Sequence, residues 1–247
     1  MSTRKFKPAL RFLGTGNAFS KHPNNAYFMP DEETIVFIDM DARNLARAQN
    51  VIRRKMPKRI YVLVTHLHND HVSGIPTLAE WLHFRCREYT DSLYICAPEK
   101  MLVILARELF EHRNISDNMV ALVTTESICR EEKNDKWLLM VIPTEHVGYH
   151  FENLCFGYLL SIGYLRVLYS GDTRTLEPFL NMSCDEFYCD MSDYGGADRP
   201  HLFWDEDKDA LIRKSQDCDV YLMHMGKETR DKLAEEISAS GLMIARA

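Results

Sequence analysis

The sequence lacks the cysteine patterns of disulfide-stabilised and thiolate-metal proteins. Its 247 residues include seven cysteines, an odd number, and none of them forms a CxxC pair. Secreted disulfide frameworks use even numbers of cysteines, and thiolate zinc sites use closely spaced pairs. We therefore expect reduced thiols and a cytosolic protein.

An excess of positive charge is also missing. Thirty Lys and Arg residues stand against 36 Asp and Glu residues, and the formal net charge is −6. Proteins that grip long RNA or DNA are usually basic, because neutralising phosphates supplies most of their affinity. The acidic balance argues against a long nucleic-acid partner, but it allows a small anionic ligand that is held by metal ions.

Long hydrophobic runs are absent as well. None approaches the ~20 apolar residues that span a bilayer, and the opening MSTRKFKPAL has basic residues but no apolar segment of a secretory signal. No Pro/Gly/Ser-rich linker and no internal repeat divides the chain, of which 46% is hydrophobic. We expect residues 1–247 to form one cytoplasmic domain with no membrane partner.

Apolar runs and helical spacings alternate along the chain. The first half predicts an antiparallel meander of strands 9–14, 26–30 and 34–40, then helix 42–56, strand 59–65, helix 75–87, strand 92–98 and helix 99–113. The second half predicts strands 119–125, 137–146, 185–192 and 219–226, a hairpin over 155–172 and helices 207–216 and 230–240. This order predicts an α/β protein with two sheets face to face and helices outside.

The segment THLHNDH concentrates metal-type ligands directly after a buried strand. If the strand continues, His66 and His68 point to the same side, because side chains alternate along a strand. Asp70 and His71 can face the same cavity from a first helical turn. Imidazole and carboxylate suit zinc, and also manganese or iron. These four residues are too many for one catalytic metal with an open position, but they are about half the ligands of two metals.

Three later strands end in residues of the same kind. They are followed by His146, Asp172 and His224, and each of these residues lies beside a glycine-containing turn. Loops at one edge of a sheet are where α/β proteins commonly place their sites. His150, four residues after His146, is the chief alternative to it as a ligand.

Taken together, these motifs resemble the metallo-β-lactamase superfamily. FLGTGNAF, THLHNDH, His146, YSGDT and LMHMG follow one another in the superfamily's order across nearly the whole chain. The resemblance implies a four-layer αββα sandwich. It also implies that one metal is bound by His66, His68 and His146, that a second is bound by Asp70, His71 and His224, and that Asp172 bridges them.

Within the superfamily, FLGTG and SGDT are most similar to the branch of ribonuclease Z and related phosphodiesterases. The tail HLFWDEDKDAL resembles small members of that branch, including cyclic-nucleotide phosphodiesterases such as the phage anti-Pycsar proteins, which destroy cyclic CMP and cyclic UMP. His146 and Asp172 are only 26 positions apart, which leaves no room for the tRNA-gripping insertion of ribonuclease Z. Cys189 and Asp190 stand where its His-Glu pair is usual. The resemblance further implies a homodimer.

A site with two divalent metals predicts a hydrolase. We expect Zn²⁺, with Mn²⁺ or Fe²⁺ as alternatives, and attack at phosphorus by a hydroxide that both metals share. Asp70 would orient this nucleophile and carry its proton, and His201 would protonate the leaving oxygen or hold the phosphate. The expected substrate is a small anionic phosphodiester, with a cyclic nucleotide favoured. The alternatives are hydrolysis of a lactone, thioester or lactam, ribonuclease Z-like RNA 3′ processing, and binding without catalysis.

Other residues receive supporting roles. Asp39, in IDMDA, is expected to support the ligand loop, and Asp190 to hold His224 or His201. Four aromatic residues near the late loop are candidates to stack on a nucleobase, although such residues are more often part of a core or an interface. These are Tyr188, Tyr194, Phe203 and Trp204.

Overall fold

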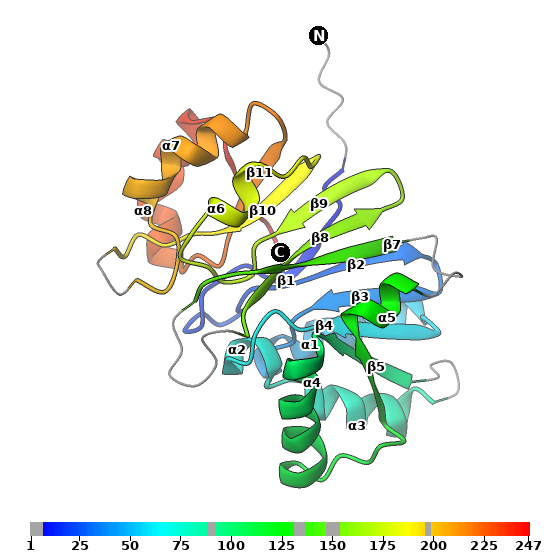
Figure 1. Ribbon diagram of the computed structural model, residues 1–247. Helices are drawn as coiled ribbons and strands as arrows, with labels where there is room; N and C mark the ends of the chain where they lie inside the picture. Colours follow the sequence, from blue (N-terminus) through cyan, green and yellow to red (C-terminus); the bar gives the residue numbers. More distant parts are fainter. Residues whose placement is uncertain (1–6, 88–91, 131–136, 147–153, 196–198) are drawn as a thin grey trace.

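The computed structural model describes residues 7–87, 92–130, 137–146, 154–195 and 199–247 (Figure 1). Within these residues the strands form two six-stranded sheets. The first contains β1 (Arg11–Gly14), β2 (Asn25–Asp31), β3 (Thr34–Ile38), β4 (Arg59–Leu63), β5 (Ser92–Ala97) and β6 (Val120–Thr124) in that order. The second contains β7 (Trp137–Pro143), β8 (Phe156–Ile162), β9 (Leu165–Tyr169), β10 (Glu186–Asp190), β11 (Asp219–Met223) and β12 (Met243–Ile244).

Each sheet begins with antiparallel strands and continues with parallel ones. The predicted meander is confirmed by the antiparallel pairs β1–β2 and β2–β3, after which β3 to β6 run parallel. In the second sheet β7, β8 and β9 are antiparallel, and β9 to β12 are parallel. Because β9, β10 and β11 are parallel, the residues that follow their carboxyl ends gather at one edge of the sheet.

The helices are α1 (Leu45–Lys55), α2 (Asn69–Val72), α3 (Ile75–Arg85), α4 (Glu99–Ala106), α5 (Thr125–Arg130), α6 (Glu177–Leu180), α7 (Trp204–Lys214) and α8 (Lys227–Ala239). Most of them lie on the outer faces of the two sheets, whereas α5 lies between β6 and β7 and buries Ile128 in the core between the sheets (Figure 1). A 3₁₀ turn, Ala42–Asn44, leads into α1, and a π-helical turn, Arg107–His112, extends α4. The predicted helices are present, whereas α5, α6 and β12 were not predicted. None of the described helices has the length and apolar character needed to cross a bilayer.

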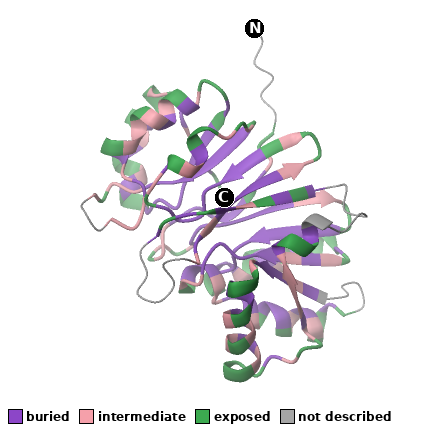
Figure 2. Cartoon of the chain, in the orientation of Figure 1, coloured by how far each residue is buried: buried purple, intermediate pink, exposed green. Residues whose placement is uncertain are grey.

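Alternation along the strands creates the layers. In β4, Ile60 and Val62 face the helices of the first half, while Tyr61 and Leu63 face the other sheet. In β11, Leu222 likewise faces the second set of helices and packs away from the inter-sheet core. The buried positions run through both sheets, with exposed residues on the outer helices (Figure 2). The predicted four-layer αββα sandwich is thereby confirmed.

Candidate metal centre

The seven predicted ligands come together at one edge of the sandwich. All are buried except His68, which is half-buried. Their positions follow the strand ends: His66 and His68 come after β4, Asp70 and His71 lie in α2, His146 comes after β7, Asp172 after β9 and His224 after β11. Residues up to 158 positions apart in the sequence are thus neighbours in space.

Two groups of three can be distinguished by their donor atoms, which lie within 4.8 Å of one another in each group. We name His66, His68 and His146 the first triad, and Asp70, His71 and His224 the second triad. In the first, His146 Nε2 lies 3.1 Å from His68 Nδ1. In the second, Asp70 Oδ2 lies 3.2 Å from His71 Nε2 and 3.5 Å from His224 Nε2.

Asp172 lies between the two triads. Its Oδ2 atom is 3.8 Å from the Nε2 atoms of both His66 and His146 in the first triad. The same oxygen is 3.5 Å from His71 Nε2 and 3.4 Å from His224 Nε2 in the second. Asp172 therefore places one carboxylate oxygen close to histidines of both triads.

The chemistry of these side chains fits two divalent metals. Among the described residues, His66 Nε2 in the first triad and His71 Nε2 in the second are buried atoms without a hydrogen-bond partner. Burying an unsatisfied polar atom costs about 1–3 kcal/mol, and more for a charged group. Cations between the triads would satisfy both atoms, and a set of imidazoles and carboxylates is one that zinc, manganese and iron accept.

The pKa values reflect crowding of buried charges. Burial alone would raise the pKa of Asp172, but the charges of His224 and His71 outweigh it and hold this pKa well below the usual range. Burial would lower the pKa of His224, but Asp172 and hydrogen bonds to Asp190 and Asp70 raise it to about 10. Burial and the charge of His71 lower the pKa of His66. The lowered pKa of Asp172 and the raised pKa of His224 both show that this centre favours positive charge beside its carboxylates.

Hydrogen bonds behind the ligands orient their rings. Asp39 Oδ2 lies 2.8 Å from His71 Nδ1, and both Asp39 oxygens accept hydrogen bonds from Thr65. His146 Nδ1 donates to the carbonyl of Pro200 at 2.7 Å. Because their Nδ1 atoms are engaged, His71 and His146 present Nε2 to the centre. The supporting role predicted for Asp39 agrees with these contacts.

Left-handed backbone conformations occur at three residues of the site. Gly171 has φ +61°, and a Cβ atom there would lie 2.6 Å from the carbonyl oxygen of Phe156. Asp39 and His224 have φ values of 62° and 60° although they are not glycines. Such strain commonly clusters at functional sites. Here it turns each chain segment sharply beside the end of a strand.

Asp190 and His201 form a pair beside the second triad. His201 Nδ1 lies 2.8 Å from Asp190 Oδ2, and Asp190 Oδ1 lies 3.5 Å from His224 Nδ1. The sequence predicted that Asp190 holds either His224 or His201, and in the structure it contacts both. His201 also approaches Asp172 Oδ2 at 3.8 Å and is 21% exposed, so that its ring borders the centre from the solvent side. His150 lies outside the described residues.

Most of the aromatic candidates for base stacking belong to the interior. Tyr188 and Trp204 are 1% and 2% exposed, Phe203 is half-buried, and Tyr194 alone among the four is exposed. Sequence reasoning did not identify the Pro200 carbonyl, since a backbone acceptor carries no signature in the residue type.

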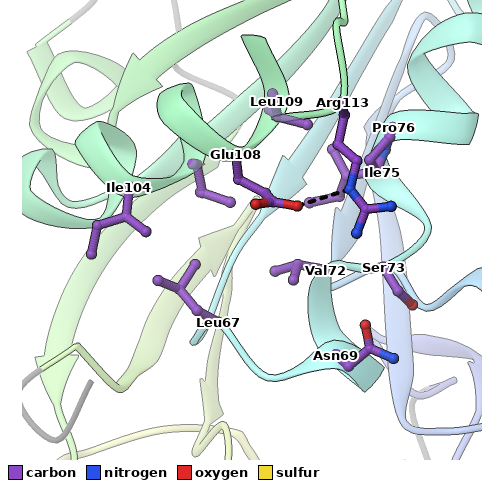
Figure 3. Close-up of a pocket in the computed structure, with 11 residues that line it drawn as sticks. Leu67, Asn69, Val72, Ser73, Ile75, Pro76, Ile104, Glu108, Leu109 and Arg113 are labelled. Atoms are coloured by element: carbon purple, nitrogen blue, oxygen red, sulfur yellow. Dashed lines mark hydrogen bonds and ion pairs between the residues drawn. The ribbon is translucent and has the colours of Figure 1, made fainter. Parts of the chain in front are cut away.

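A separate cavity of about 280 Å³ lies on the reverse side of the ligand segment (Figure 3). Leu67, Val72 and Leu109 contribute to its mostly apolar wall, and Glu108 and Arg113 form an ion pair of 2.8 Å across one side. None of the seven predicted ligands lines it. The cavity is therefore distinct from the metal centre, although Leu67 belongs to the same segment.

Comparison with known proteins establishes the family. A sequence model described as "Anti-Pycsar protein Apyc1" matches residues 8–231. The chain belongs to this family. The Apyc1 family consists of cyclic-nucleotide-degrading phosphodiesterases with a metallo-β-lactamase His/Asp metal site. The resemblance to phage anti-Pycsar proteins and the prediction of a metal-dependent hydrolase are thus confirmed.

Other relatives of this Apyc1-family chain are more distant. Ribonuclease Z of Methanocaldococcus jannaschii is 31% identical over 141 residues, which span 56% of this chain and only 44% of the ribonuclease. The metallo-β-lactamase fold protein YhfI from Bacillus subtilis has a TM-score of 0.72 at 13% identity, over 96% of this chain and 95% of YhfI. Zn²⁺-bound PqqB from Methylobacterium extorquens has a TM-score of 0.69 at 15% identity, over 96% and 97%. Both structures show that the fold is that of the metallo-β-lactamases.

Proposed function

We propose that this chain hydrolyses cyclic nucleotides at a pair of divalent metals held by His66, His68, Asp70, His71, His146, Asp172 and His224. The observation that carries the proposal is the position of Asp172 Oδ2, within 3.4–3.8 Å of histidines in both triads. Membership of the Apyc1 family supports the reaction class.

Zinc is the metal that we propose. Imidazole-rich ligation favours it, and the structurally similar PqqB binds Zn²⁺. When bound at the two triads, the metals would lower the pKa of a water and neutralise charge on the phosphate oxygens. This positive charge would allow a protein of net charge −6 to hold a phosphodiester.

The chain's own residues would complete the reaction. Asp70 lies at the centre of the second triad, where its carboxylate can orient the attacking water and accept its proton. His201 borders the centre and is held through Nδ1 by Asp190, which leaves Nε2 to protonate the departing ribose oxygen. Asp190 is a positioning residue, because its contacts are with His201 and His224.

RNA processing is a weaker candidate, although ribonuclease Z is a relative. The β8–β9 hairpin, Phe156–Tyr169, occupies most of the interval between His146 and Asp172. The described part of this interval is a two-stranded hairpin rather than a long arm, and the net charge of −6 disfavours a polyanion. As further parts of the proposal, we infer a cytoplasmic location and a homodimer.

A substrate screen tests the function. Purified protein is incubated with 3′,5′- and 2′,3′-cyclic nucleotides, bis(p-nitrophenyl) phosphate, a lactone and a precursor tRNA, each with and without a chelator. We expect chelator-sensitive hydrolysis of cyclic nucleotides. Turnover of the lactone or the tRNA without cleavage of any cyclic nucleotide would contradict the proposal.

The role of His201 has a sharper test. In H201N, hydrolysis of cyclic nucleotides should fall about 10²-fold, because their alkoxide leaving group needs a proton. Cleavage of bis(p-nitrophenyl) phosphate should fall much less, because p-nitrophenolate leaves without protonation. Equal losses on both substrates would show that His201 serves another purpose.

A further inference from the structure

The side chain of Phe19 is almost wholly exposed in a loop that is otherwise well held. It lies between β1 and β2, and 95% of it is accessible to solvent. Asn17 organises the turn: its Oδ1 accepts from Phe19 N at 3.2 Å and from Ser20 Oγ at 2.9 Å, and its carbonyl accepts from Ser20 N at 2.9 Å. The backbone that carries Phe19 therefore has a defined conformation.

Arg43 fixes the same turn from a second direction. Its Nη1 atom donates to the carbonyls of Ala18 and Ser20, at 2.7 and 3.0 Å, on either side of Phe19. Arg43 itself is held by the buried carboxylate of Asp41 at 2.8 Å. A charged side chain is thus used to hold the backbone on both sides of an exposed ring.

The loop reaches the second triad from one side through the segment after His224. Met225 N donates to the carbonyl of Thr15 at 3.1 Å. A Cβ atom on Gly226 would lie 2.7 Å from Asn17 Nδ2, so that Asn17 occupies the space beside this glycine. The turn that carries Phe19 is therefore packed directly against the chain that positions His224.

From the other side, the loop connects to Asp70. Asp41, which holds Arg43, donates its N–H to Asn25 Oδ1 at 2.9 Å, and Asn25 Nδ2 approaches the carbonyl of Asp70 at 3.4 Å. The turn is thus linked to both segments that carry the second triad. Phe19 is the exposed residue of a turn that borders the segments of the second triad.

We propose that Phe19 is a substrate-specificity residue on which the base of the cyclic nucleotide stacks while the phosphate lies at the metals. This inference rests on the proposed function. A flat apolar ring is suited to the face of a nucleobase, and such stacking tolerates different bases because every base has a π-face. A preset loop also favours stacking, since little conformational entropy is lost on binding.

The test compares F19A with F19Y on two substrates, a 3′,5′-cyclic nucleotide and 1-O-methylribose 3′,5′-cyclic phosphate, which lacks the base. Y164A is the control. Tyr164 is 104% exposed in the turn between β8 and β9, at the opposite end of β9 from Asp172. In F19A, the ratio of kcat/KM for the nucleotide to that for the base-free substrate should fall about tenfold, through KM. F19Y should restore it, and Y164A should retain the wild-type ratio.

The possible failures can be told apart. If the wild-type chain cleaves no cyclic nucleotide, the proposed function fails, whatever F19A does. If the wild type is active and F19A keeps its ratio, or loses activity equally on both substrates, the stacking role is wrong. Size-exclusion chromatography is run in parallel. If F19A converts a dimer to a monomer and leaves the ratio of kcat/KM values unaltered, Phe19 belongs to a contact between copies instead.

Discussion

Replacing Asp172 by asparagine removes the bridging carboxylate with little change in volume. If two ions are each supplied at 100 times their dissociation constant, each stabilises the native wild-type chain by ~2.7 kcal/mol, or about 5 kcal/mol together. For a chain of this length, 1 kcal/mol corresponds to ~2–4 °C in Tm. Saturating zinc should therefore raise the wild-type Tm by about 10–20 °C over the value in chelator.

In D172N both triads lose the oxygen that lies within 3.8 Å of their Nε2 atoms. Loss of even an outer-sphere partner typically weakens metal binding by 10–100-fold. If each affinity falls about 100-fold, the same zinc concentration half-fills each site, and the two sites together contribute only about 1 kcal/mol. The zinc-induced rise in Tm should shrink to about 2–4 °C.

The assay is differential scanning fluorimetry with and without zinc, together with the zinc content of dialysed protein. The rise on adding zinc is the readout, because D172N also changes the stability of the chelated chain by removing a charge near His71 and His224. D209N, at an exposed position of α7, serves as the control. A D172N variant with the wild-type rise and two zinc ions per chain would refute the bridging role.

Three further predictions follow from the same contacts. The pKa of His224 is raised to about 10, whereas a metal requires the neutral imidazole. Binding of zinc at pH 7 should therefore release protons, and the affinity of the chain for zinc should increase as the pH rises toward 10. Calorimetry that gave the same binding enthalpy in buffers of different ionisation heats would be inconsistent with this. Asparagine tolerates the φ of 62° at position 39, but D39N should weaken the hydrogen bond that orients His71. The affinity for zinc should therefore fall about 10–100-fold in a chelator competition. An unaltered affinity would rule out the supporting role of Asp39. G171A should destabilise the chain by about 1–3 kcal/mol more than G163A in urea titrations, because both glycines have positive φ but only Gly171 faces the Phe156 carbonyl at 2.6 Å. Equal losses would contradict this.

The sequence was most informative where periodicity and residue chemistry coincide. The strands were predictable because apolar runs alternate faces, as Ile60 to Leu63 do between the two cores. The convergence of the seven candidate ligands at one edge was predictable because residues of metal-binding type follow the apolar strands. The short elements α5, α6 and β12 were missed, since four to six residues, or two in β12, give too little periodic signal.

Contacts between distant segments were beyond prediction. The hydrogen bond from His146 to the Pro200 carbonyl joins residues 54 positions apart, and its acceptor is a backbone atom that any residue would supply. The double contact of Asp190 with His201 and His224 depends on how three loops fold against one another. The exposure of Phe19 is likewise a tertiary property, since a phenylalanine in a loop is as readily buried.

The two-metal centre is tested most directly by a crystal of the zinc-loaded protein measured on both sides of the zinc absorption edge. We expect two anomalous peaks ~3.5–4 Å apart, one beside His66, His68 and His146 and the other beside Asp70, His71 and His224, with Asp172 contacting both. A single peak, or peaks held by other residues, would contradict the two-metal centre on which the proposed reaction depends.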